Sequence, residues 1–180
     1  MNIQTIYQNA FFFAAQKHQR AKNWIKGTED VPYAVHLGNV AMEIIFAHHQ
    51  APTFDLGFAI QLALLHDVLE DTPCQQEELQ EKFGTAVAEG VIALTKDKSI
   101  EKNLRMADSL ERILSSPAEV GMVKLADRIT NLQPPPSPWT KEKIRAYYTD
   151  AELIFNTLGH LNAALSERMK DQMAFYQSFF

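Results

Sequence analysis

A segment near the middle of this 180-residue chain ends in side chains that can bind a metal ion or transfer a proton. The apolar residues 62–65 are followed by His66, Asp67, Glu70 and Asp71. If a single helix runs through the segment, Glu70 lies on the same edge as His66, and Asp71 lies on the same edge as Asp67. Adjacent residues on a helix point about 100° apart, so His66 and Asp67 reach one ion only at this edge. Other helices must therefore supply the remaining ligands.

Two residues elsewhere in the chain could complete such a site. His36 stands at the start of a predicted helix, and Asp127 lies within the apolar segment 123–132. A carboxylate in the middle of an apolar helix is rarely buried without a partner, and a metal ion or an ion pair would satisfy it. Taken singly, His36 would be a surface histidine and Asp127 the partner of Lys124 or Arg128. The joint pattern on three helices favours a metal site.

This donor set could bind a divalent ion that activates a water molecule. Two imidazoles and two carboxylates suit a divalent ion of borderline hardness, such as Mn²⁺, Fe²⁺, Co²⁺ or Zn²⁺. Such an ion with open positions binds water and lowers the pKa of that water toward neutrality. Glu70 and Asp71 lie one turn beyond the ligands, where a carboxylate could orient the water or accept its proton. Glu70 and Asp71, an acid pair, are therefore the candidate catalytic residues.

Helical spacing of apolar residues runs through almost the whole chain and would position these groups. Seven glycines and eight prolines are few for this length, so long elements are expected and an all-β fold is excluded. Thr72, Ser116 and Thr140 stand where each can cap the start of a helix, and Gly84 stands where a helix should end. The pattern predicts an all-α bundle of about eight to nine helices. The predicted helices cover residues 3–20, 36–50, 55–70, 73–83, 85–95, 100–114, 117–132, 141–158 and 161–176.

Composition narrows the class of protein. Seventeen Lys plus Arg against twenty-two Asp plus Glu give a net charge of −5, which argues against a general nucleic-acid binder but allows a small phosphorylated ligand. The single Cys74 excludes a disulfide framework and fits a reducing cytoplasm. No signal peptide or membrane-length apolar run is present. Phe11, Phe12 and Phe13 cover three sides of one helical turn, which points to a homodimer or to packing under the last helix. We expect one cytoplasmic domain over residues 1–180 without nucleic-acid or membrane partners.

The joint pattern resembles the HD-domain metal-dependent phosphohydrolases. Within them it is similar to the hydrolase part of the RelA/SpoT family, and above all to its stand-alone small alarmone hydrolases. The resemblance spans roughly residues 14 to 155. It rests on residues 32–36, 63–72, 83–84, 123–132 and, more weakly, 139–148.

The resemblance implies a concrete reaction and a set of site residues. The family removes pyrophosphate from the 3′ position of (p)ppGpp and leaves GDP or GTP, and its usual ion is Mn²⁺. By this resemblance Glu70 and Asp71 handle the attacking water, Asn131 contacts the nucleotide, and Tyr147 lies near the substrate phosphates. The implied metal ligands are His36, His66, Asp67 and Asp127.

The sequence departs from the family in its substrate-recognition residues. A basic pair that is usually contiguous is split here into Arg20 and Lys22, and a longer loop, residues 23–31, follows it. Leu37 stands where the family commonly has proline, and residues 103–106 lack the usual acidic member. The candidate substrate-binding residues are Arg20, Lys22, Lys98, Arg105, Lys124, Asn131 and Tyr147.

These departures leave alternatives for the substrate and for the class of protein. The chain could hydrolyse another nucleotide, such as a nucleoside monophosphate or a dinucleotide cofactor phosphate. It could also be a non-catalytic nucleotide-binding regulatory module, although the presence of Glu70 and Asp71 favours an enzyme. The basic run from Lys96 to Arg105 is either solvated or draws in pyrophosphate. Tyr33 either packs in the core or stacks on a base.

Overall fold

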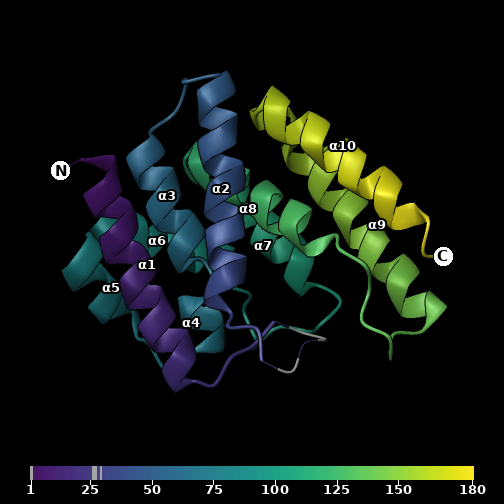
Figure 1. The fold of residues 1–180 in the computed structure, drawn as a ribbon, viewed down its shortest axis with the longest axis horizontal. Coiled ribbons are helices and arrows are strands. Elements are labelled where there is room, and N and C mark those ends of the chain that lie inside the picture. Colours follow the sequence, from purple (N-terminus) through teal and green to yellow (C-terminus); the bar gives the residue numbers. More distant parts are fainter. Residues whose placement is uncertain (1, 26–27, 29) are drawn as a thin grey trace.

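Helices make up the regular structure of this protein, as the sequence predicts. The computed structural model describes residues 2–25, 28 and 30–180, and these contain no strand beyond one isolated bridge between Trp24 and Pro32 (Figure 1). The elements are α1 (Ile3–Arg20), α2 (Ala34–Gln50), α3 (Leu56–Leu65), α4 (Val68–Asp71), α5 (Gln76–Phe83), α6 (Thr85–Leu94), α7 (Arg105–Leu114), α8 (Ala118–Asn131), α9 (Lys141–Leu158), a 3₁₀ turn η1 (Gly159–Leu161) and α10 (Ala163–Gln177).

Two helices form the centre of the bundle and carry most of the core. Seven of the ten residues of α3 are buried, and this helix packs against α1, α2, α6 and α8. Ten of the fourteen residues of α8 are buried, with α2, α9 and α10 on its other sides. A helix that is apolar all round, such as α3, must be enclosed by others. α8 is equally enclosed although it also buries charged residues, among them Lys124, Asp127 and Arg128. Figure 1 shows α9 and α10 side by side at one end of the molecule.

The predicted helix over residues 55–70 is wrong as one continuous element. It ends at Leu65, and the short helix α4 begins at Val68. Asp67 stands between them with φ −101° and ψ 1°, outside the helical region. The assumption that Glu70 and His66 lie on one continuous helix therefore fails, because the helix is interrupted between them.

Two of the three predicted helix starts differ in the structure. Thr140 caps α9 by accepting a hydrogen bond from the Lys143 amide at 3.3 Å, as predicted. Thr72 instead donates its hydroxyl to the Val68 carbonyl at 2.7 Å, and α5 begins only at Gln76. Ser116 likewise donates to the preceding helix, and α8 starts at Ala118 after Pro117. Both hydroxyls donate to the helix behind them. Thr72 Oγ1 also accepts a hydrogen bond from the Cys74 amide at 3.2 Å, but no helix begins there.

Two glycines have distinct reasons for their positions. Gly84 ends α5 with φ +88°, a conformation that side chains with a Cβ rarely adopt, as its predicted place at a helix end requires. Gly121 lies inside α8, where an added Cβ would come within 2.3 Å of the Leu161 side chain. Close packing of η1 on α8 therefore requires glycine at this position.

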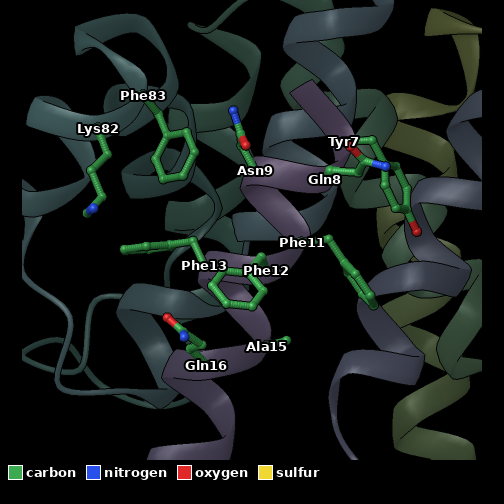
Figure 2. A pocket seen from close by; sticks show the side chains of 10 residues that line it. All are labelled: Tyr7, Gln8, Asn9, Phe11, Phe12, Phe13, Ala15, Gln16, Lys82 and Phe83. Carbon is green, nitrogen blue, oxygen red and sulfur yellow. The ribbon is translucent and has the colours of Figure 1, made fainter. Parts of the chain in front are cut away.

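The three consecutive phenylalanines of α1 have different environments, and Figure 2 shows them pointing in different directions. Phe13 is buried with its ring edge-on to Phe83 of α5, at a centroid distance of 5.2 Å. Phe11 lies partly buried beside Gly38 of α2, whereas Phe12 is 67% exposed. The predicted packing of this turn under the last helix is wrong, because α1 packs on α2, α3 and α4. The homodimer stays a prediction.

Among the residues that the structure describes, none of the helices has the length and apolar character needed to cross a bilayer.

Candidate metal centre

Four side chains from three parts of the fold converge at one point, and they are the four that the sequence singles out. His36 lies in the first turn of α2, His66 and Asp67 lie in the break between α3 and α4, and Asp127 lies on α8. The Nε2 atoms of His36 and His66 are 3.4 Å apart. Asp67 Oδ2 lies 2.9 Å from Nε2 of His66 and 4.0 Å from Nε2 of His36. Asp127 Oδ1 lies 3.3 Å from His36 Nε2 and 3.7 Å from His66 Nε2.

This donor set fits a divalent metal ion. An ion about 2.1 Å from each donor atom holds neighbouring donors roughly 3.0–3.4 Å apart, close to most of the separations found here. Two nitrogen and two carboxylate donors also suit the borderline ions that the sequence suggests. His36, His66 and Asp67 form a compact group of metal-capable atoms, and Asp127 faces both imidazoles.

The backbone at the end of α3 selects the histidine tautomer that a metal needs. Nδ1 of His66 lies 2.8 Å from the Ala63 carbonyl oxygen. A carbonyl oxygen can only accept a hydrogen bond, so Nδ1 must carry the proton. Nε2 is then left with its lone pair, and this atom faces the other three donors.

Electrostatics bind the cluster together. Burial alone would lower the pKa of His66, but the neighbouring Asp67 and Asp127 carboxylates outweigh it and raise that pKa well above the ordinary value. Burial alone would raise the pKa of Asp67, but the effect of His66 is larger than that of burial and lowers this pKa. The pKa of Asp127 is likewise held well below its usual range, chiefly by Lys124. Positive charge between the two carboxylates is therefore strongly favoured.

Two residues predicted to contact the substrate contact the Asp127 carboxylate. Asn131, one turn further along α8, donates its side-chain amide to Asp127 Oδ1 at 2.6 Å. The Lys124 ammonium is buried and lies 3.5 Å from Asp127 Oδ2. Each therefore fixes the orientation of a candidate ligand, whatever further contact it makes with a nucleotide.

The candidate acid pair lies on α4 and is tied to a distant loop. Glu70 accepts hydrogen bonds from both the amide and the ammonium of Lys96, each at 3.2 Å. The Lys98 ammonium donates to the Glu70 carbonyl at 2.9 Å, and Asn23 donates its side-chain amide to the Asp71 carbonyl at 2.7 Å. Burial alone would lower the pKa of Lys96, but Glu70 outweighs it and raises that pKa, so the ammonium stays charged.

Of the remaining cations predicted to bind substrate, two are exposed and one is hydrogen-bonded to the backbone. Arg20 and Lys22 are exposed where α1 ends, and Lys22 has a left-handed φ of 56°. Residues 26, 27 and 29 of the long loop that follows lie outside the described residues. Arg105 donates to the carbonyls of Ile100 and Lys98, so its guanidinium holds the loop before α7.

Tyr147 lies in an aromatic and cationic cluster between α8 and α9. The guanidinium carbon of Arg128 lies 4.2 Å from the centroid of the Tyr147 ring. The Trp139 ring lies edge-on to the same ring, at a centroid distance of 5.3 Å. Burial raises the pKa of Tyr147 to about 12. The hydroxyl therefore stays protonated at neutral pH and can donate a hydrogen bond.

Three residues that support the site were not assigned to it from the sequence. Tyr33, for which the sequence suggested core packing or stacking on a base, donates its hydroxyl to Asp67 Oδ2. Asn23 and Lys96 hold the acid-pair segment, but each is remote from it in sequence. Their contacts depend on loop paths that no local pattern encodes.

Comparison with known proteins places this geometry in context. Residues 10–162 match the HD domain family. The chain is 34% identical over 162 residues to the guanosine-3′,5′-bis(diphosphate) 3′-pyrophosphohydrolase MESH1 of Danio rerio, covering 88% of this chain and 87% of the relative. It is 32% identical to the human protein of the same name, with the same coverage. A solved structure of a metazoan ortholog of SpoT that hydrolyzes ppGpp matches with a TM-score of 0.82 and 29% identity over 97% of each chain.

Removing one imidazole should abolish metal binding. His66→Ala deletes the Nε2 donor that lies closest to Asp67, so we expect the protein to lose stoichiometric Mn²⁺ after gel filtration, measured by elemental analysis. His160→Ala, which changes a histidine on η1, serves as the control and should retain the ion. Retention of Mn²⁺ by His66→Ala would refute the ligand assignment.

The stabilisation by Mn²⁺ should grow with pH. In protein stripped of metal by a chelator, the raised pKa of His66 means that its proton stabilises the fold at low pH. That contribution is lost as the pH rises through the raised pKa, whereas a metal must displace the same proton to bind. The melting-temperature increase caused by Mn²⁺ should therefore be larger at about pH 8 than at about pH 6. A shift that is constant or shrinks over this range would contradict the linkage.

Proposed function

This chain belongs to the HD domain family, and we propose that it is a metal-dependent phosphohydrolase that removes the 3′-pyrophosphate of (p)ppGpp to give GDP or GTP. The observation that carries the proposal is the convergence of His36, His66, Asp67 and Asp127 in a chain matched over most of its length by relatives that bear this activity in their names. We treat residues 1–180 as one such domain, because one buried core runs from Ala10 to Tyr176. The cytoplasm remains its proposed location, on the basis of the single cysteine.

The four convergent side chains would hold the ion, for which we propose Mn²⁺. A bound divalent ion supplies a water of lowered pKa and positive charge against the phosphoryl oxygens. The chain's own part is to keep the donors fixed. Ala63 holds the tautomer of His66, and Asn131 and Lys124 hold the carboxylate of Asp127. Donors fixed in this way need little rearrangement when the substrate arrives.

The acid pair would manage the proton of the attacking water. Asp71 lies at the end of α4 with its backbone held by Asn23, and its carboxylate is the proposed proton acceptor together with that of Glu70. Lys96 holds the Glu70 carboxylate in one orientation through two hydrogen bonds. A positioned carboxylate can accept a proton as attack proceeds and return it to the leaving group.

The proposed substrate pocket draws its charge from several elements. Arg20 and Lys22 from the end of α1, and Lys98 from the loop before α7, are the exposed cations proposed to face the phosphates. Asn131 and Tyr147 are proposed to contact the nucleotide, the latter through a hydroxyl that stays protonated. Local positive charge of this kind lets an acidic protein bind a polyphosphate.

A substrate panel tests the proposal directly. With Mn²⁺ added, we expect purified protein to convert ppGpp to GDP and pyrophosphate, followed by chromatography of the nucleotides. The panel includes a nucleoside monophosphate and a dinucleotide cofactor phosphate, because the split basic pair and the engaged Arg105 alter substrate recognition. Turnover of another nucleotide with ppGpp untouched would replace the proposed substrate. Nucleotide binding without any turnover would favour a regulatory module.

Loss of the acid pair should separate catalysis from metal binding. We expect Glu70→Ala plus Asp71→Ala to lower turnover by about 10²–10⁴-fold, because proton transfer then falls to bulk water. Bound Mn²⁺ should stay stoichiometric by elemental analysis. The matched control is Glu167→Ala plus Asp171→Ala, an exposed acidic pair on α10 that should keep full turnover. Unchanged turnover in the α4 variant would overturn the mechanism.

A further inference from the structure

We propose that Tyr33 is a positioning residue for the metal centre, whose hydroxyl holds the ligating oxygen of Asp67 while the contacts behind its ring join that ligand to the acid-pair segment. The inference rests on the proposed metal-dependent function and names a residue that supports it. It is carried by one connected set of contacts among His18, Asn23, Tyr33 and Asp67.

The hydroxyl of Tyr33 contacts the oxygen of Asp67 that faces the two imidazoles. It donates a hydrogen bond to Oδ2, the same atom that lies 2.9 Å from Nε2 of His66. The terminal torsion of an aspartate is broad, so its carboxylate plane is set by whatever hydrogen-bonds to it. Asp67 also sits in a break between helices, where no regular helix restrains it. The Tyr33 hydroxyl therefore helps to fix which oxygen points into the cluster.

Tyr33 is itself held from several sides. Its ring stacks on that of His18 at a centroid distance of 4.7 Å and an interplanar angle of 28°, and it leans on His36 at 5.0 Å. Its amide donates to the Asn23 carbonyl at 3.3 Å, and its own carbonyl accepts from the His36 amide at 2.9 Å. A ring that contacts two other rings and is hydrogen-bonded through its backbone has little freedom to move. The position of the hydroxyl is thus set before any ligand binds.

The contacts behind the ring reach the acid-pair segment. The side-chain amide of Asn23 lies 3.2 Å from Nδ1 of His18 and 2.7 Å from the Asp71 carbonyl oxygen. His18 is fully buried, and burial outweighs the pull of Asp67 to lower its pKa to about 4. His18 is therefore neutral at physiological pH and can accept the Asn23 hydrogen bond without adding charge beside the metal ligands. One small cluster thus spans from a ligand to the end of α4.

Loss of the hydroxyl should weaken metal binding without disturbing the fold. Groups that orient a metal ligand are commonly worth 10–100-fold in affinity or activity. Tyr33→Phe removes the hydrogen bond to Asp67 and keeps the ring on His18 and His36. We expect its Kd for Mn²⁺, measured by isothermal titration calorimetry on chelator-treated protein, to rise about tenfold.

A matched control and a second measurement distinguish positioning from general stability. Tyr148→Phe also removes one hydrogen-bonded hydroxyl, which accepts from Gln177 at 2.7 Å on the distant α9–α10 pair, and its Kd should equal that of the wild type. The melting temperature of metal-free Tyr33→Phe should stay near the wild-type value. A lowered melting temperature with an unchanged Kd would give Tyr33 a merely structural role and overturn the proposal.

The outcomes also separate this inference from the proposed function. If the wild type binds Mn²⁺ and Tyr33→Phe binds it equally tightly, only the positioning role fails. If the wild type binds no Mn²⁺, the proposed metal centre fails, and the positioning role fails with it. A weakened Kd in Tyr33→Phe beside wild-type affinity in Tyr148→Phe is the result expected.

Discussion

Two carboxylates can be buried side by side only where positive charge lies between them, and the cluster of His36, His66, Asp67 and Asp127 meets that condition. Desolvation alone would push the pKa of each acid upward, yet the neighbouring imidazoles and Lys124 hold both well below their usual range. The same carboxylates raise the pKa of His66. A cluster with this balance attracts a proton or a cation. The two imidazoles are buried and the carboxylates largely so, which limits the screening of this attraction by solvent.

The break between α3 and α4 is what allows the cluster to form. Adjacent residues on one continuous helix diverge by about 100°, and His66 and Asp67 would then point away from each other. With Asp67 outside the helical region, its Oδ2 comes within 2.9 Å of His66 Nε2. After the break, α4 is hydrogen-bonded through Glu70 to the loop that carries Lys96 and Lys98. A departure from regular structure at a site of chemistry is expected where geometry outweighs helix propensity.

The all-α fold is predicted from apolar spacing of short range, whereas the four convergent residues are predicted only when their positions on three helices are taken together. Apolar spacing identifies the helices, and polar groups at the ends or middles of apolar helices stand out against that spacing. The helix starts predicted at Thr72 and Ser116 are misplaced, because both hydroxyls donate to the preceding helix and the next helix begins further along the chain, at Gln76 and Ala118. The pairing of Lys96 with Glu70 joins residues 26 positions apart through a loop whose path depends on tertiary packing. The hydrogen bond from Tyr33 to Asp67 could not be predicted from the sequence either, because it also depends on tertiary packing.

The hydrogen bonds between Glu70 and Lys96 connect the candidate acid pair to the loop that carries Lys96 and Lys98. Glu70 accepts from Lys96 through its carboxylate and from Lys98 through its carbonyl, and Arg105 holds the same loop through the Lys98 carbonyl. A polyphosphate drawn to these cations would therefore act on the segment that carries Glu70 and Asp71. Asn23 donates to the Asp71 carbonyl and accepts from the Tyr33 amide, and the Tyr33 hydroxyl donates to Asp67. Hydrogen bonds thus connect the candidate metal ligand Asp67, the segment that carries Glu70 and Asp71, and the loop that carries Lys96 and Lys98.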